Sequence, residues 1–207
     1  MQLKYLLSRI YIFSFLFFSV LTSGLCQEKR TSQDFDIVVA GFKIGGMTAE
    51  KIENTNQTKF EINSLVEFWF FGNVHVEFLQ TASYEDKQLV EAYTHSISNR
   101  GDFETVVRWS TDHYEVDAET YKFENNEPIY QKVYSSPARF YFEEPNNGDI
   151  LISENFGMLT KVKEEKPGVY SINVNGNTNT FYYEYGVLQK VVLENSLKNY
   201  VIRRSND

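Results

Sequence analysis

Apolar and polar residues alternate along most of this chain with a period of two. Such alternation is typical of β-strands that bury one face. The clearest example is the segment from Lys59 to Phe70, where one face carries Phe60, Ile62, Val66, Phe68 and Phe70 and is interrupted by Ser64 alone. The same pattern recurs at Val74–Phe78, Phe103–Trp109, Tyr170–Val174 and Phe181–Tyr185. We therefore predict a chain built mainly of strands.

Short turn sequences separate these predicted strands. The pair Asn175-Gly176 is typical of a two-residue type I′ turn, because that turn needs positive φ at both central positions. It would place Val174 opposite Asn177 and Tyr170 opposite Phe181. Further turns are indicated at Arg100-Gly101, Asn147-Gly148, Pro167-Gly168 and Tyr185-Gly186. Strands joined by such short turns form an antiparallel meander.

Two segments have sequences that are compatible with a helix. The stretch Ser83–Ser96 fits either a helix or a hairpin closed at residues 85–87, and we favour the hairpin. One short helix is predicted near 136–142, because Ser136 suits an N-cap and Pro137 suits the first helical position.

Aromatic residues also occupy the alternate face of some predicted strands. Trp69 and Phe71 are out of phase with Phe68, and Tyr182 is out of phase with Tyr183. A flat sheet with one wet face would not need them, whereas a curved sheet around an interior would. The expected fold is all-β and mainly antiparallel, a strongly curved meander sheet or half-barrel. Two packed sheets are the alternative.

Glycines at positions 41, 45 and 46 resemble a nucleotide-binding loop only superficially. Their spacing fits neither of the phosphate-binding glycine motifs, and no helix is expected after them. We interpret Gly41, Gly45 and Gly46 as a strand–bulge–strand corner.

The first 26 residues have the pattern of a secretory signal peptide. Lys4 and Arg9 give a positive start, the apolar run Ile10–Leu21 follows, and small and polar residues come next. The run is shorter than the roughly 20 apolar residues of a membrane span, which favours a cleaved signal peptide over the alternative, an uncleaved membrane anchor. The mature chain is therefore expected to have no integral membrane span. Cleavage is expected after Cys26, leaving Gln27 first, or else after Gly24. The N-terminal signal helix would then be removed.

The rest of the chain divides into a disordered segment, residues 27–33, and one β-rich domain, residues 34–204. Export predicts a place in the periplasm or at the cell surface. Cys26 could alternatively carry the lipid of a bacterial lipoprotein, although Leu25 before it is not the usual small residue.

Composition excludes several functional classes. The 207 residues include 28 Asp+Glu, 20 Lys+Arg and one Cys, with a formal charge of −8. Loss of Lys4 and Arg9 with the signal peptide leaves 18 basic and 28 acidic residues, a charge of −10. This acidity argues against nucleic acid as a partner. A single cysteine excludes a disulfide framework and any zinc site with several cysteine ligands.

Several segments resemble a known family. They are residues 35–47 (FDIVVAGFKIGGM), residues 141–145 with 153–157, and residues 179–187 near the C-terminus. Together they are similar to an uncharacterised domain-of-unknown-function family of exported Bacteroidetes envelope proteins. The resemblance covers most of residues 34–204 and implies a compartment and a fold rather than a chemistry. More distantly, the opening strand–glycine–strand unit resembles lipoprotein-carrier-like half-barrels, which hold lipidic ligands against a concave sheet.

Candidate chemistry is sparse, and we predict no catalytic residue, no metal site and no cofactor. If the strands around residues 85–87 pair as a hairpin, Glu77 falls near His95 with His75 one diagonal step away, which could bind a metal. Such a site depends on a register that the sequence does not fix. A hydrolase could use the acids Glu143, Glu144, Asp149 and Glu154, but abundant carboxylates catalyse only when positioned.

The chain is rich in aromatic residues, with 33 in all. Most are expected in the core, and some could line a concave apolar pocket. The candidates for ligand binding are Trp69, Trp109, Phe140, Tyr141 and Phe142, the last three as a lid or plug from the short helix. We therefore expect a non-enzymatic envelope protein, a carrier or chaperone-like module, that binds an apolar small molecule or lipid. A module that binds an envelope protein or a glycan is the alternative, and a hydrolase comes last.

Overall fold

The computed structural model describes residues 28–69, 74–194 and 199–205, most of them in antiparallel β-strands. The expected all-β, mainly antiparallel fold is confirmed. The predicted signal helix and the cleavage site at Cys26 and Gln27 lie outside the described residues.

One sheet of thirteen strands contains most of the chain, and its order places β1 in the middle rather than at an edge. From one edge to the other the strands are β11 (Lys163–Lys166), β12 (Val169–Val174), β13 (Asn177–Glu184), β14 (Val187–Leu193), β15 (Tyr200–Arg204), β1 (Lys29–Val39), β2 (Phe42–Glu53), β3 (Gln57–Phe68), β4 (Val74–Glu85), β5 (Gln88–Ser98), β6 (Gly101–Trp109), β7 (Tyr114–Thr120) and β8 (Phe123–Asn125). A separate hairpin pairs β9 (Ile150–Ser153) with β10 (Met158–Lys161). A short helix, η1 (Pro137–Tyr141), completes the described elements.

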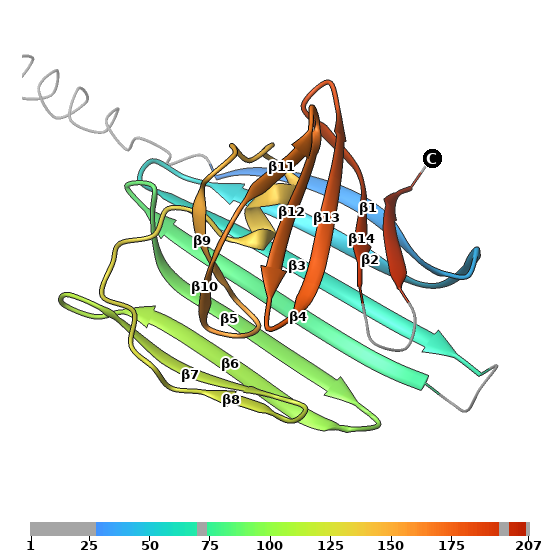
Figure 1. Cartoon of the computed structure of the whole chain (residues 1–207), viewed down its shortest axis with the longest axis horizontal. Coiled ribbons are helices and arrows are strands. Elements are labelled where there is room, and N and C mark those ends of the chain that lie inside the picture. The colour runs from blue at the N-terminus through green and yellow to red at the C-terminus, as the bar shows by residue number, and fades with distance from the viewer. Residues whose placement is uncertain (1–27, 70–73, 195–198, 206–207) are drawn as a thin grey trace, which may run out of the picture.

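The sheet folds over itself without closing. In Figure 1 the strands β11–β13 cross in front of the long strands β3–β5, with η1 between the two parts. Ring contacts agree with this arrangement: Phe140 of η1 packs on Phe181 of β13 at 5.1 Å between ring centroids, and Tyr141 packs on Phe35 of β1 at 5.3 Å. The core therefore lies inside the fold, between the two arms of one sheet.

Tight turns produce the meander. Four hairpins close with two residues that both have positive φ, at Ala40-Gly41, Asp86-Lys87, Asn175-Gly176 and Tyr185-Gly186. Such turns match the right-handed twist of the strands they join. The predicted pairing of Val174 with Asn177 and of Tyr170 with Phe181 is confirmed, as is the hairpin over residues 83–96.

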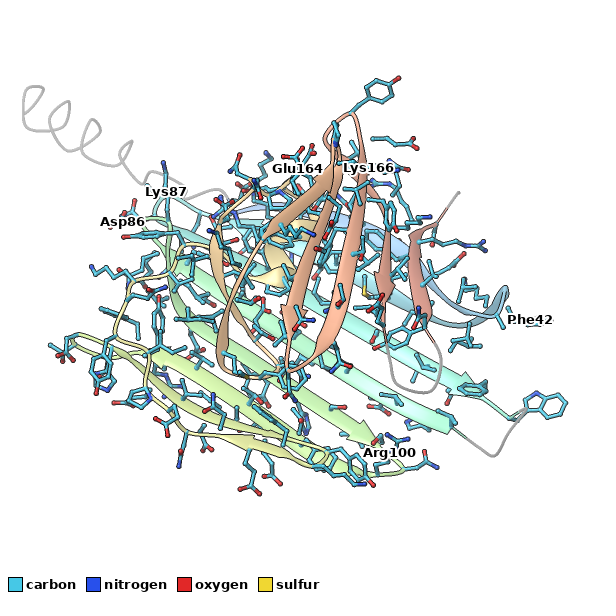
Figure 2. The ribbon with its side chains drawn as sticks, in the orientation of Figure 1. Phe42, Asp86, Lys87, Arg100, Glu164 and Lys166 are labelled. Carbon is cyan, nitrogen blue, oxygen red and sulfur yellow. The ribbon has the colours of Figure 1, made fainter. Side chains whose placement is uncertain are left out.

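The two edges of the open sheet are short and polar. The edge strand β11 has the sequence KEEK, with all four residues exposed, and β8 at the other edge is three residues long. Figure 2 labels Glu164 and Lys166 on β11, near the top of the view. Charged, short edge strands oppose pairing with other chains.

Two expectations need correction. Residues 29–33, predicted to be disordered, form the start of β1 and pair with residues 49–53 of β2. Their polar sequence concealed the strand, because this part of β1 is largely exposed and needs no apolar alternation. The predicted helix near 136–142 is one 3₁₀ segment, and the Ser136 side chain makes no N-capping hydrogen bond.

The glycine corner is confirmed as a strand–bulge–strand unit. The β1–β2 register shifts between Ile37 and Val38, and the turn at Ala40-Gly41 joins the strands. Gly45 is required by a close approach, because a Cβ there would lie 2.3 Å from the backbone oxygen of Leu65. A Cβ on the next residue, Gly46, would have no neighbour closer than the Phe35 oxygen at 4.0 Å.

We predict that Gly45→Ala destabilises the fold by about 1–3 kcal/mol, because backbone atoms of β3 must move to admit the methyl group. The matched change Gly46→Ala should alter the free energy of unfolding by no more than about 0.5 kcal/mol. Urea unfolding of both variants beside the unaltered chain measures the difference. Equal stabilities for the two variants would contradict the close approach.

Candidate functional site

The five aromatic residues predicted to bind a ligand do not come together in one site. Phe140, Tyr141 and Phe142 all pack inside the fold, and Phe140 is only 1% exposed. Trp69 follows β3 and is 72% exposed, whereas Trp109 ends β6 and packs edge-on against Tyr114 at 4.8 Å. Trp69 is therefore exposed beyond the end of β3, whereas Trp109 packs against the same core as Phe140 and Tyr141.

The helix η1 works as a plug of the interior. Phe142, just after it, packs on Phe60 of β3, and the Tyr183 hydroxyl of β13 donates a 2.6 Å hydrogen bond to the Phe140 carbonyl oxygen. These contacts join η1 to both arms of the sheet. The chain's own rings therefore occupy the space in which an apolar ligand was expected.

Buried polar groups fix the N-terminal end of the plug. One oxygen of Glu154, the residue after β9, accepts a 3.0 Å hydrogen bond from the Ala138 backbone N–H. The Ser136 hydroxyl and the Gln80 side chain also bond to this carboxyl group. The Tyr84 hydroxyl in turn donates to the Ser136 hydroxyl oxygen at 2.8 Å. Glu154 thus provides the cap that Ser136 was expected to provide.

Glu154 is an unusual group to find in a core, with only 1% of its surface exposed. Burial raises the pKa of its carboxyl group to about 7, and the hydrogen bonds from Ser136 and Ala138 offset only part of that rise. The group is therefore near its midpoint at neutral pH. It faces packed side chains rather than a cleft, so its environment is that of a structural carboxyl group.

The other carboxylates considered for hydrolysis also have structural partners. Glu143 forms ion pairs with Lys51 at 3.0 Å and with Arg139 at 2.6 Å. Burial alone would raise the Glu143 pKa, but the hydrogen bonds from these two cations lower it overall. Asp149 accepts a hydrogen bond from the Asn146 backbone N–H at 2.9 Å. Glu143 and Asp149 thus each have their own local contact, and Glu154 is buried against η1.

The histidines considered for metal binding are divided between different carboxylates. His75 lies between Glu67, at 3.1 Å, and Glu77, at 2.9 Å. Hydrogen bonds to Glu77 and then Glu67 raise the pKa of His75. His95 instead contacts Asp102 at 2.6 Å, and Glu77 is paired with Ile97 across β4 and β5. Among the described residues no group of three or more His, Cys, Asp or Glu side chains could hold a metal ion.

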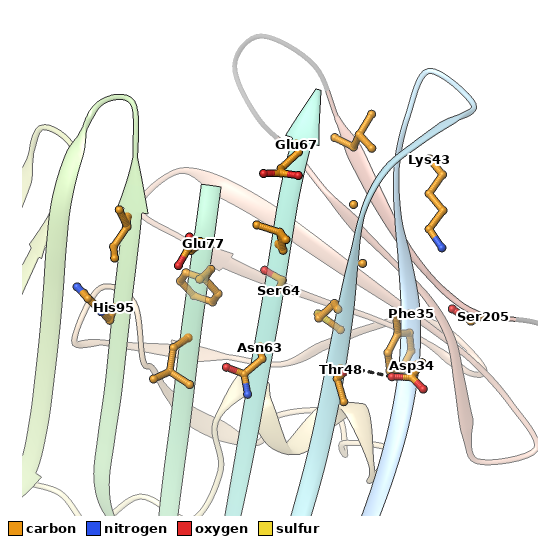
Figure 3. Close-up of a pocket in the computed structure, with 18 residues that line it drawn as sticks. Asp34, Phe35, Lys43, Thr48, Asn63, Ser64, Glu67, Glu77, His95 and Ser205 are labelled. Atoms are coloured by element: carbon orange, nitrogen blue, oxygen red, sulfur yellow. Dashed lines mark hydrogen bonds between the residues drawn. The ribbon is translucent and has the colours of Figure 1, made fainter. Parts of the chain in front are cut away.

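A depression of about 1050 Å³ lies on β1–β5. Most of the side chains that line it alternate with the core-facing residues of these strands, so it opens on the outer face of the sheet. Figure 3 shows Glu67, Glu77 and His95 on successive strands at one side, with Asp34, Lys43 and Ser205 at the other. None of the five predicted aromatic residues lines it.

The outer face of the depression exposes apolar side chains. Leu65 of β3 is 46% exposed and Ile97 of β5 is 39% exposed, and Leu79 of β4 also lines the surface. Sequence reasoning missed these residues because it searched the aromatic positions. A signal was present: Ser64 occupies a core-facing position within the apolar alternation of β3, while its apolar neighbour Leu65 is out of phase.

Comparisons with known proteins identify a family whose function is unknown. The family model described as Domain of unknown function (DUF6134) matches residues 35–205. A crystal structure of a beta-barrel-like protein of another domain of unknown function, DUF1849 from Brucella abortus, is 10% identical, with 84% of this chain and 95% of that chain covered and a TM-score of 0.48. No curated protein matches the chain. Within the described residues, no helix is long and apolar enough to cross a membrane.

We predict that Glu154→Gln raises stability at alkaline pH by up to about 3 kcal/mol, because the carboxyl pKa rises from 4.5 in the unfolded chain to about 7 in the fold. The folded chain binds this proton more tightly, so the contribution of Glu154 is fully present below pH 4.5 and is lost as pH rises through 7. The advantage of the variant should therefore be large at pH 8 and small at pH 4.5. Urea unfolding across this range measures it.

The exposed Glu119→Gln on β7 serves as the control, and its stability relative to the unaltered chain should not follow this pH dependence. A Glu154→Gln difference that stays constant between pH 4.5 and 8 would show that the carboxyl group does not titrate as its burial requires.

Proposed function

The chain belongs to the DUF6134 family of domains of unknown function, and we propose that it is a non-enzymatic binding module of the cell envelope whose partner docks on the outer face of β1–β5. The observation that carries this proposal is the open depression of about 1050 Å³, in which Leu65 and Ile97 are exposed. Isolated exposed apolar residues are ordinary, whereas several gathered in a concavity with polar groups at its rim suit a binding site.

Packing of the interior supports a site on the outside. A ligand between the two arms of the sheet would have to displace η1 and the adjoining Phe142, whose rings contact Phe35, Phe60 and Phe181. It would also have to break the hydrogen bond from Tyr183 to the Phe140 carbonyl oxygen and the one from Ala138 to Glu154. Docking on the outer face needs no such rearrangement.

The envelope part of the proposal rests on the N-terminal sequence. A positive start, an apolar run of 12 residues and the small and polar residues after it favour export by a signal peptide ending at Cys26. An exported, acidic chain would reach the periplasm or the cell surface. There it could meet protein, glycan or lipid partners.

Non-enzymatic binding is favoured by the way the acidic groups are used. The hydrolase candidates Glu143 and Glu154 bond to Arg139 and to Ala138, which are parts of η1. Carboxylates engaged in holding the fold together are poor candidates for general acid and base catalysis, which needs free access to a substrate. Binding by surface complementarity requires none of them to react.

Site-specific photo-crosslinking in the cells that make the protein tests this function. We expect the full chain with Ile97→benzoylphenylalanine to form an adduct on irradiation, because position 97 lines the depression. The same analogue at Glu119, an exposed position of β7, should give little adduct. Electrophoresis detects a protein adduct, and mass spectrometry of an organic extract detects a lipid.

A second substitution distinguishes an adduct formed by specific docking from one formed by non-specific collision. Leu65→Lys introduced beside the reactive group should reduce the yield, since it replaces an exposed apolar contact with a charge. No adduct at position 97, or equal yields at positions 97 and 119, would contradict the proposed function.

A further inference from the structure

An exposed carboxylate in an apolar frame is the most distinctive feature of the outer depression. Glu77 of β4 is paired directly with Leu65 on β3 and with Ile97 on β5. Leu79 lies two residues along the same strand and so shares the face of Glu77. Three apolar side chains thus surround one carboxylate, all four of them lining the depression.

A missing side chain deepens the surface next to this frame. Gly46 of β2 is paired with Leu65, and a Cβ on it would meet no atom closer than 4.0 Å. Packing therefore does not require glycine at position 46, in contrast to position 45. The effect of Gly46 is to leave space beside Leu65 on the outer face.

The charge of the depression is negative. Asp34, Glu67 and Glu77 line it, against one lysine, Lys43, and one histidine, His95. Lys43 already forms an ion pair with Asp36, and His95 contacts Asp102. The cationic groups are thus engaged by acids outside the lining.

The single histidine beside Glu67 and Glu77 does not cancel their charge. His75 contacts both carboxylates, so even a fully protonated imidazolium leaves the three groups with one net negative charge. The rim therefore attracts cations over a range of pH and repels anionic groups such as phosphate head groups.

We propose that this depression binds a basic segment of a partner protein, in which lysine or arginine side chains lie beside apolar residues. The methylene stem of the basic side chain packs on Leu65, Leu79 and Ile97, and its charged end reaches Glu77. Long basic side chains bury their stems while their charged ends stay hydrated. The inference rests on the proposed function and adds the chemistry of the partner.

Fluorescence anisotropy with a labelled synthetic heptapeptide that alternates lysine and leucine tests the inference on the purified mature chain. We expect binding that weakens as salt rises from 0.05 to 0.5 M, because surface charge attraction is screened. The same peptide with glutamate in place of every lysine should bind at least about tenfold more weakly, since like charges oppose docking.

Two variants locate the binding. Glu77→Gln removes the framed charge and should weaken the lysine peptide about fivefold, the size expected of one partly exposed ion pair. Gly46→Leu fills the space beside Leu65 and should abolish binding, with its fold checked by urea unfolding. Glu119→Gln makes the same charge change on β7 and should leave the affinity unchanged.

Equal affinity for the lysine and glutamate peptides overturns the inference, as does unchanged binding in both Glu77→Gln and Gly46→Leu. A photo-adduct at position 97 without affinity for the lysine peptide overturns the partner chemistry alone. Absence of an adduct at position 97 overturns the proposed function as well.

Discussion

An open sheet buries its apolar face only where another part of the chain packs against that face. Here the packing partner is η1, a 3₁₀ helix of five residues. Rings on or next to η1 contact Phe35 and Phe60 in one arm of the sheet and Phe181 in the other. Among the described strands the edges β11 and β8 do not pair, so those strands form no closed ring of hydrogen bonds around the interior. The attachment of η1 therefore decides whether the two arms share one core, and it leaves the interior filled.

Polar contacts make that attachment specific. A 3₁₀ helix leaves backbone N–H groups without partners at its start, and burial of such a group is costly. The carboxyl group of Glu154, the residue after β9, accepts a hydrogen bond from the Ala138 N–H. Ser136 hydrogen-bonds to the same carboxyl group and to Tyr84 of β4. The cost is a titratable group in the core whose pKa is raised to about 7. Hydrophobic packing and this polar network thus fix the same five residues from two sides.

Local sequence signals predicted the local structure well. The Asn175-Gly176 turn and its register, the hairpin over residues 83–96 and the glycine corner near Gly45 all follow from neighbouring residues, and the structure confirms them. The pairing of β1 with β15 joins segments more than 160 residues apart, and no local pattern encodes it. Capping of η1 by Glu154 was missed for the same reason, because Ser136 followed by Pro137 fits the local pattern of an N-cap.

The depression was missed for a different physical reason. The alternation of apolar and polar residues identifies the face of a strand that enters the core and assigns the other face to solvent. Apolar residues on the outer face are therefore not recognised as part of a site. Leu65 and Ile97 are of this kind, and their proximity depends on the registers of β3, β4 and β5 together. The sequence also cannot show which of two adjacent glycines the fold requires. Gly45 is required because of its contact with β3, whereas packing does not constrain Gly46. A residue that the fold does not require, on a face that the core does not use, is where selection for binding would act.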